Sequence, residues 1–345
     1  MTVKRINLAL QGGGAHGAFT WGVLDRLLED ERLEIAGISG ASAGAMNGAA
    51  LKSGWVEAGR RGAKERLDWL WQQLGAVQDM RLTSWLTGFA PDTGAISAAM
   101  EYALPFTFAE SLSRLTSPYS FGPFYQNPLT PVAEAFDYDK VCDSCGPALF
   151  VGATNVRSGK VRIFSGTEIS TEVLLASACL PTMFQAVQLR DPETGEEEAF
   201  WDGGYSGNPA LFPLFYSGLP DDIVVVNINP LDRADLPVTP QQINNRINEI
   251  SFNSSLLREL RVIAYAQSLD LDPDRQDGLA RARVHMIADN ALMNDLSVMT
   301  KLVPSPVVLA RLKAAGRQAA ETFLATHFDD LNQRSSVDLQ AMFDD

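Results

Sequence analysis

Apolar and polar positions near the amino terminus follow two periodicities in alternation. The apolar run over residues 6–10 is typical of a strand, and after a glycine-rich stretch the apolar residues of 19–28 recur at helical spacing. Residues 35–39 predict a second strand, and the alanine-rich segment 42–51 predicts a second helix. This order of strand, helix, strand and helix indicates an α/β fold, with a central, mostly parallel sheet flanked by helices.

The rest of the chain continues the mixture of strands and helices. We expect helices over 56–76, 172–178, 240–270 and 306–327, and strands over 148–156, 160–164, 187–189, 199–201, 223–227 and 284–287. The strands 187–189 and 199–201 flank a polar loop and predict a hairpin. The acidic tail after Asp329 has no such pattern, and we expect it to be loose.

Composition supports a globular domain, and the charge excludes one class of partner. The 345 residues are 46% hydrophobic and 20% charged, which is ordinary for such a domain. The 28 Lys and Arg residues against 42 Asp and Glu residues give a formal net charge of −14, so nucleic acid is not an expected partner. Because there is no Lys/Arg cluster to attract anionic lipid, we expect any membrane contact to be transient and to rest on apolar patches.

Targeting signals and metal motifs are not evident in the sequence. The amino terminus has no signal-peptide core, and no apolar run reaches the roughly 18 residues of a membrane span, which predicts a cytoplasmic protein. Cys142 and Cys145 form a C-x-x-C pair, but there is no second pair and no nearby histidine to complete a zinc site. We therefore expect no metal and no cofactor.

The strongest chemical signal is the pentapeptide Gly40-Ala41-Ser42-Ala43-Gly44, which follows a predicted strand and opens a predicted helix. A nucleophile elbow requires this context, because the turn is tight and the residues beside the serine must be small. The serine would lie at the amino end of a helix, where the helix dipole favours a developing anion. Ser42 is therefore the candidate nucleophile, with Gly40 and Gly44 as supporting residues.

A second signal is the glycine loop of residues 12–17, which precedes the first predicted helix. Adjacent glycines can turn several backbone N–H groups into one concavity. In an acyl hydrolase this concavity would be the oxyanion hole, formed by Gly12, Gly13 and Gly14 with Gly17 supporting the turn.

The same loop also matches G-x-G-x-x-G, the fingerprint of nucleotide-binding oxidoreductases. That fingerprint requires an acidic residue at the end of the second strand, to bind a ribose hydroxyl. Here the second strand ends in Ser39-Gly40, and Glu34 lies at its opposite end. The sequence therefore favours the oxyanion hole.

A third signal is Asp202-Gly203-Gly204, directly after the predicted strand 199–201. A serine hydroxyl is a weak nucleophile and needs a base, and Asp202 is one candidate. The order Ser42, Asp202, His285 would also suit an α/β-hydrolase triad. We disfavour the triad, because those enzymes carry the nucleophile deeper in the sheet, whereas Ser42 follows the second strand.

In this order, the glycine loop, the serine elbow and the D-G-G turn resemble the motif set of the patatin-like phospholipases. The likeness to bacterial members is close over residues 11–25 (QGGGAHGAFTWGVLD) and 38–47 (ISGASAGAMN), and residues 177–184 resemble the small-residue and Pro-x-x-Phe stretch before the D-G-G. The resemblance implies a patatin-like three-layer sandwich, with a catalytic domain over 5–230. It implies nothing firm about 231–345, where the helical patterns predict a mainly helical extension packed on that domain.

The resemblance also implies a Ser–Asp dyad that needs no histidine. Ser42 would be the nucleophile, Asp202 the general base, and the three glycines the oxyanion hole. The implied reaction is hydrolysis of a lipid ester, of the phospholipase A or lysophospholipase kind, through an acyl-enzyme. An esterase, a thioesterase or an intracellular polyester hydrolase with the same dyad is an alternative, and the intact dyad disfavours a lipid-binding protein without activity.

Three further features are open at the level of sequence. His16 is either a solvent-facing residue of the first helical turn or a helper near the site. Asn155, at the end of its strand, either supports the site or forms a turn. The aromatic stretch 80–128 is either a packed layer or the wall or lid of an acyl-chain site.

Overall fold

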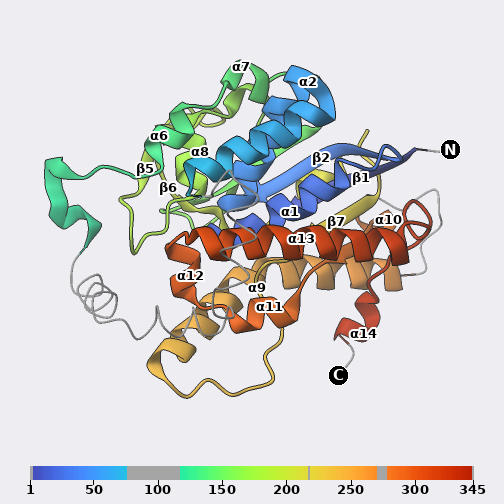
Figure 1. Cartoon of the computed structure of the whole chain (residues 1–345). Coiled ribbons are helices and arrows are strands. Elements are labelled where there is room, and N and C mark those ends of the chain that lie inside the picture. Colours follow the sequence, from blue (N-terminus) through green and yellow to red (C-terminus); the bar gives the residue numbers. More distant parts are fainter. Residues whose placement is uncertain (1–2, 76–116, 217, 270–277, 344–345) are drawn as a thin grey trace.

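The computed structural model describes residues 3–75, 117–216, 218–269 and 278–343, and it is a three-layer α/β sandwich (Figure 1). Its single sheet has the strand order β5-β6-β3-β2-β1-β7-β8, with β4 paired to β3. The strands are β1 (Lys4–Leu10), β2 (Leu33–Ala41), β3 (Ala148–Asn155), β4 (Val161–Ser165), β5 (Val187–Arg190), β6 (Glu197–Asp202), β7 (Asp222–Val226) and β8 (Arg283–Ile287).

The centre of the sheet is parallel, and one side of it is antiparallel. Strands β3, β2, β1, β7 and β8 pair in parallel, whereas β4, β5 and β6 join through antiparallel pairs. The hairpin of β5 and β6 is the one predicted from its polar loop. Because β2 and β3 run in parallel beside β1, the loops that follow β1 and β2 lie at the same edge of the sheet.

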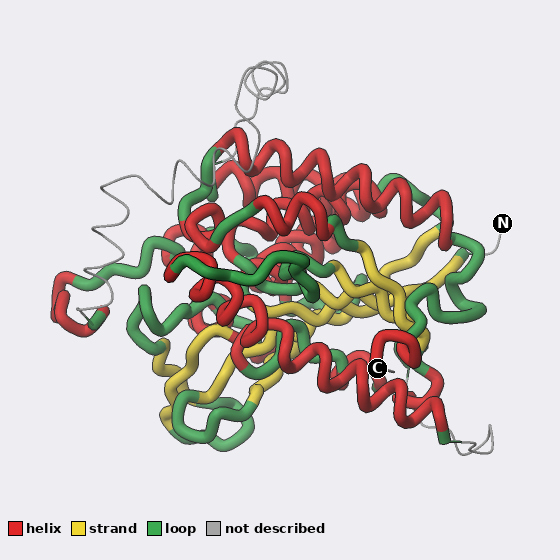
Figure 2. Tube along the Cα trace, turned by 90° about the horizontal axis from the view of Figure 1, so that it is seen from below, coloured by secondary structure: helices red, strands yellow, loops and turns green. Residues whose placement is uncertain are grey.

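Helices cover both faces of the sheet, as Figure 2 shows from below. One face carries α1 (Gly17–Leu27), α2 (Ala43–Gln73), α8 (Thr171–Ser177) and α13 (Pro306–His327); the other carries α9 (Pro240–Ser268) and α14 (Leu339–Phe343). The other helices are α6 (Thr130–Glu134), α7 (Tyr138–Val141), α10 (Gly278–Arg281), α11 (Asn290–Asp295) and α12 (Val298–Leu302). Within the described ranges, no helix is long and apolar enough to cross a membrane.

The alternation of side chains along each strand builds two cores. On β1, Leu8 and Leu10 enter the core beneath α1, α2 and α13, whereas Ala9 enters the core beneath α9. Strands buried on both faces are continuous apolar runs, which explains the run over 223–226 in β7. Helices α1 and α13 approach backbone to backbone, because a Cβ at Gly22 or Gly316 would lie 2.0 Å from a carbonyl oxygen of the other helix.

The carboxyl-terminal region is integrated into this sandwich. Strand β8 pairs in parallel with β7, so the sheet itself crosses the boundary that we expect near residue 230. The expectation of a loose tail is wrong up to residue 343, because Leu331 and Leu339 are buried and the Ser335 hydroxyl accepts a hydrogen bond from the Val284 N–H. Apolar anchors and backbone contacts, which a charge count does not reveal, hold this segment.

The two helices predicted over 42–51 and 56–76 are present within α2, where they meet at a kink with non-helical backbone angles at Ala58 and Gly59. Of the aromatic stretch 80–128, residues 80–116 lie outside the described residues, and residues 118–124 form a 3₁₀ segment.

Candidate active site

The Ser42 elbow forms as predicted, between the end of β2 and the start of α2. Ser42 has φ 53° and ψ −123°, a left-handed conformation that costs a side-chain-bearing residue energy and recurs at functional sites. The tight turn explains the small neighbours, because a Cβ at Gly44 would lie 2.1 Å from the Leu10 carbonyl oxygen, and one at Gly40 would lie 2.7 Å from the Gly44 backbone.

A hydroxyl that the sequence did not single out holds the backbone of Ser42. Ser177, at the end of α8, accepts a hydrogen bond from the Ser42 N–H at 2.9 Å and donates one to the Gly152 carbonyl at 2.7 Å. Ser177 is fully buried, and Gly152 lies on β3 beside the strand that carries Asp202. The Ser177 hydroxyl therefore ties the elbow to the strands beside it.

The glycine loop packs directly on Ser42. A Cβ at Gly12 would lie 2.7 Å from the Cβ of Ser42, and a Cβ at Gly17 would lie 2.7 Å from that of Ala43. Gly14 has φ +57° and opens a 3₁₀ turn that leads into α1. Only glycine at these positions lets the loop approach the elbow this closely.

The three loop glycines expected to form an oxyanion hole are not equivalent. The Gly12 N–H donates to the Asn208 Oδ1 atom at 2.6 Å, so it is not free to bind an oxyanion. Among the described residues, none accepts a hydrogen bond from the N–H of Gly13 or Gly14. Two of the three predicted donors are therefore free in the structure.

Asp202 is the last residue of β6 and is fully buried. Its backbone is fixed at both ends: its N–H donates to the Cys179 carbonyl, and its carbonyl accepts the Thr154 hydroxyl, each at 2.8 Å. The Gly204 N–H donates to Oδ1 at 2.7 Å, whereas Oδ2 has no hydrogen-bond partner in the described part of the chain. Gly203 and Gly204 are needed here because added Cβ atoms would lie 2.2 Å from Gly152 and 2.4 Å from Phe252.

The environment of Asp202 makes its carboxyl group basic. Burial raises the pKa of Asp202 to about 7, and the hydrogen bond from Gly204 and the nearby Ser42 hydroxyl only partly offset this rise. The Ser42 hydroxyl thus acts on the carboxyl group, but the two side chains do not meet in the geometry of a full hydrogen bond. Catalytic pairs are often loose before substrate binds, so the arrangement suits a nucleophile and its base.

His16 belongs to the glycine loop, and its side chain is fully buried. The Thr300 hydroxyl donates to the Ser297 carbonyl, so its oxygen accepts from His16 Nε2 at 2.7 Å and leaves Nδ1 without a proton. Burial and the charge of Lys301 hold the pKa of His16 well below its usual range. The expectation of a solvent-facing His16 is therefore wrong, and its Nε2 faces α12 instead of Ser42.

His285 and Glu34, on which the triad and the nucleotide site would depend, lie apart from Ser42. His285 bonds Asp222 at 3.1 Å, and its register position on β8 matches that of Ile38 three strands away, a separation of about 14 Å across the sheet. The triad is therefore not assembled. Glu34 is exposed at the amino end of β2 and pairs with Arg5. It is therefore at the wrong end of the strand to bind the ribose of a nucleotide.

The side chain of Asn155 stabilises a turn and does not contact the candidate active site. Its Oδ1 accepts hydrogen bonds from the N–H groups of Arg157 and Ser158 at 3.0 and 2.9 Å, and another from the Ser158 hydroxyl. This pattern is an Asx turn, which closes the loop between β3 and β4.

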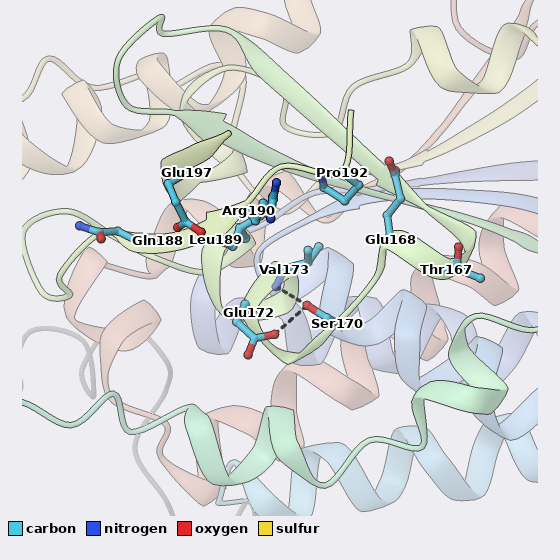
Figure 3. A pocket seen from close by; sticks show the side chains of 10 residues that line it. All are labelled: Thr167, Glu168, Ser170, Glu172, Val173, Gln188, Leu189, Arg190, Pro192 and Glu197. Carbon is cyan, nitrogen blue, oxygen red and sulfur yellow. Dashed lines mark hydrogen bonds between the residues drawn. The ribbon is translucent and has the colours of Figure 1, made fainter. Parts of the chain in front are cut away.

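A surface pocket of about 370 Å³ lies away from Ser42 and Asp202, on α8 and the β5–β6 hairpin (Figure 3). Its lining includes the charged residues Glu168, Glu172, Glu197 and Arg190, which do not suit an acyl chain. The Ser170 hydroxyl bonds both the Glu172 carboxylate and the Val173 N–H there. Within the described ranges, no group of three or more His, Cys, Asp or Glu residues could hold a metal ion.

The residues that the sequence missed are amides and hydroxyls behind the loop. Asn208 and Asn229 both bond Gly12, and Ser177 bonds Ser42. Asn208 stands before a proline and Asn229 precedes Pro230, so each looks like a turn residue in the sequence. For Asn229 the available signal was its place within three residues of the end of a buried parallel strand, β7.

Three solved structures are similar to this chain at low identity. VipD from Legionella pneumophila has a TM-score of 0.42 and 16% identity over 94% of this chain and 67% of its own. Human GIVD cytosolic phospholipase A2, in complex with methyl γ-linolenyl fluorophosphonate, has a TM-score of 0.31 and 15% identity over 92% of this chain and 59% of its own. The ExoU–SpcU complex from the type III secretion system of Pseudomonas aeruginosa has a TM-score of 0.25 and 14% identity over 95% of this chain and 61% of its own. This chain thus spans about 60% of the last two.

The comparisons of sequence are more decisive. A search of the curated proteins finds no match. The sequence model of the patatin-like phospholipase family, by contrast, matches residues 8–215, a range that contains the glycine loop, the serine elbow and the D-G-G turn. Because this range is more than half of the 345 residues, the chain belongs to the patatin-like phospholipase family.

Proposed function

We propose that the chain is a serine-dependent lipid acyl hydrolase with Ser42 as nucleophile and Asp202 as general base. Membership of the family supports lipid acyl hydrolysis as the class of reaction. The observation that carries the dyad is a fully buried carboxyl group whose pKa is raised to about 7, beside a strained serine and a glycine loop. A base with this pKa suits proton transfer near neutral pH.

In the acylation step, the Ser42 Oγ attacks the ester carbonyl carbon while its proton moves to the free Oδ2 of Asp202. The carbonyl oxygen becomes an oxyanion, which the free N–H groups of Gly13 and Gly14 stabilise. The tetrahedral intermediate collapses by breaking the bond to the alcohol oxygen. Asp202 returns the proton to this oxygen, and the alcohol leaves behind an acyl-enzyme.

Water reverses these roles in the deacylation step. Asp202 accepts a proton from water as the water oxygen attacks the acyl carbonyl, and the same two N–H groups bind the second oxyanion. The Ser42 Oγ leaves with the proton held by Asp202, and the fatty acid is released. The free serine and the ionised aspartate are thereby restored.

We also propose that a lipid surface is reached through the amino-terminal half of α9. Ile243, Ile247 and Ile250 share one helix face and are all exposed, and Leu236 before the helix is 82% exposed. The same helix packs on the D-G-G turn, where the Phe252 ring lies 5.2 Å from that of Tyr205. Such an apolar face beside the site suits transient contact with zwitterionic lipid.

Vesicle flotation with phosphatidylcholine tests this contact. The double variant Ile243→Glu, Ile247→Glu should lose binding and retain hydrolysis of a soluble ester. Val262→Glu, a change at an exposed apolar residue farther along α9, is the matched control and should still bind. Equal binding by both variants would contradict the proposed contact.

The dyad is tested by hydrolysis of a chromogenic medium-chain ester. We expect Ser42→Ala and Asp202→Asn to lose activity and His285→Ala, where it folds, to retain it. Full activity in Ser42→Ala would overturn the proposal. A panel of phospholipid, lysophospholipid, thioester and polyester substrates would then separate these substrate classes.

A further inference from the structure

The backbone of Gly12 is held from behind the glycine loop by two buried asparagines. Asn208 makes two hydrogen bonds to this backbone: its Oδ1 accepts from the Gly12 N–H at 2.6 Å, and its Nδ2 donates to the Gly12 carbonyl at 3.3 Å. Asn229 donates a second hydrogen bond to the same carbonyl, from Nδ2 at 2.9 Å. Both asparagines are fully buried, so these contacts do not compete with bulk water.

The orientations of the two amides follow from their partners. The atom of Asn208 that faces the Gly12 N–H must be its oxygen. The Oδ1 of Asn229 accepts from the Lys301 ammonium at 2.7 Å, which leaves its Nδ2 to donate. The chain of contacts therefore runs from the Lys301 cation through the Asn229 amide to the Gly12 carbonyl.

The Gly12 carbonyl and the Gly13 N–H belong to the same trans peptide, and so they point in opposite directions. Fixing the carbonyl towards the asparagines thus turns the Gly13 N–H away from them, to a side on which none of the described residues accepts it. Hydrogen bonds to a peptide carbonyl also polarise the peptide and strengthen its N–H as a donor. A cation at the start of the chain of contacts adds to this polarisation.

We propose that Asn208, Asn229 and Lys301 are positioning residues that aim and strengthen the Gly13 N–H as an oxyanion donor. They touch neither the substrate nor the reacting atoms. This inference rests on the proposed function, because it assigns the support of that site's oxyanion hole. Lys301 fits the role: it lies on α12, and its own carbonyl oxygen would be 2.3 Å from a Cβ at Gly14, so α12 packs against the loop.

The test compares two buried asparagines: Asn229, which follows β7, and Asn7, which lies on β1. Asn229→Ala removes the shorter of the two hydrogen bonds to the Gly12 carbonyl, and Asn7→Ala is the matched control. Asn7 is fully buried on β1 and donates from Nδ2 to the Pro220 carbonyl at 2.7 Å, at a position on β1 three residues before Leu10. Steady-state hydrolysis of a soluble ester is measured for each variant and normalised to the sites titrated with a fluorophosphonate.

We expect Asn229→Ala to lower kcat by about 10- to 100-fold with KM nearly unchanged, since loss of a whole oxyanion donor costs about 10²- to 10³-fold. Asn7→Ala should lose thermal stability and keep kcat. Lys301→Met, which leaves both asparagines in place, should lower kcat by about 3- to 10-fold by removing the polarising charge.

A kcat in Asn229→Ala equal to that of Asn7→Ala, or a loss confined to KM, would overturn the inference. If Asn229→Ala does not fold, Lys301→Met decides, and an unchanged kcat in that variant would overturn it. Failure of the proposed function is separable: in that case Ser42→Ala would be active, whereas Ser42-dependent hydrolysis with normal kcat in both variants removes only the positioning role.

Discussion

Two buried aspartates in this sheet have opposite environments. Asp202, at the end of β6, is fully buried with one free carboxylate oxygen, and burial raises its pKa to about 7. Asp222, at the start of β7, is equally buried. Burial alone would raise the pKa of Asp222 too, but hydrogen bonds from His285 and Asn332 and the charge of Arg283 together hold it below its ordinary value.

The difference teaches how to separate structural from reactive carboxylates. Asp222 is surrounded by partners that neutralise its charge, which makes it an anchor for β8 and for the carboxyl-terminal segment at Asn332. Among the described residues no counter-charge offsets the burial of Asp202, so its proton affinity is high, and its Oδ2 has no hydrogen-bond partner there. Burial is common to both residues, and the partners decide the function.

The sharpest test of this contrast is removal of each charge. We expect Asp202→Asn to lower kcat/KM by at least about 10³-fold, since the base for Ser42 is lost while the shape is kept. Asp222→Asn should keep kcat/KM within about twofold per titrated site, because it touches no reacting atom. Steady-state ester hydrolysis measures both, and a large loss of kcat/KM in Asp222→Asn would break the comparison.

For the free energy of unfolding we expect the opposite ranking: loss of Asp222 should destabilise the fold, and loss of the Asp202 charge should not. Asp222→Ala should lower the free energy of unfolding by about 3 kcal/mol, because it removes the carboxylate that bonds the buried His285 Nε2 and forms the shorter of the two ion pairs of Arg283. The folded pKa of Asp222 is lowered, so its contribution is present above the ordinary value of 3.8 and is lost as the pH falls through the folded value. Urea denaturation at pH 7 measures the loss. Removal of the exposed ion pair in Arg5→Ala is the control and should cost under about 1 kcal/mol.

The pH dependence of activity should report Asp202. Because its pKa is raised to about 7, the carboxyl group is protonated at lower pH and cannot act as a base. We expect kcat/KM to fall about tenfold for each pH unit below 7 and to reach a plateau above pH 7. A stopped assay with a soluble ester from pH 5 to 9 measures this, and a flat profile would contradict the assignment.

The smallest expected effect is a gain in stability. The folded pKa of Asp202 exceeds the ordinary 3.8, so the folded state binds more protons between these values and its stability falls as the pH rises from 3.8 to about 7. Asp202→Asn removes this cost and should gain on the order of 2 kcal/mol at pH 8 and less at pH 5. Thermal denaturation at the two pH values measures the gain, and a lower Tm at pH 8 would argue against a buried, uncompensated charge.

Much of the fold could be predicted from periodicity. The helices expected over 240–270 and 306–327 match α9 and α13 closely, because long helical patterns are local signals. The β5–β6 hairpin and the Ser42 elbow are also encoded locally, in a polar loop and in small residues around a serine. The packed tail was not, because its order depends on contacts with residues more than 50 positions away, such as that of Ser335 with Val284.

The site divides in the same way. Glycines, Ser42 and Asp202 carry motifs that can be found in the sequence, whereas the amides that hold Gly12 come from residues 196 and 217 positions away. An asparagine at the end of a strand or before a proline is typical of a turn, and Asn155 does form a turn. Only the three-dimensional arrangement distinguishes Asn155 from Asn208 and Asn229.

The most direct test of the dyad is covalent labelling with an alkyl fluorophosphonate, followed by peptide mapping and by the rate of labelling. We predict one adduct, on Ser42, formed at least about 100-fold more slowly in Asp202→Asn and at an unchanged rate in Asp222→Asn. An adduct on another residue, or labelling of Asp202→Asn at the wild-type rate, would contradict the assignment of Ser42 and Asp202.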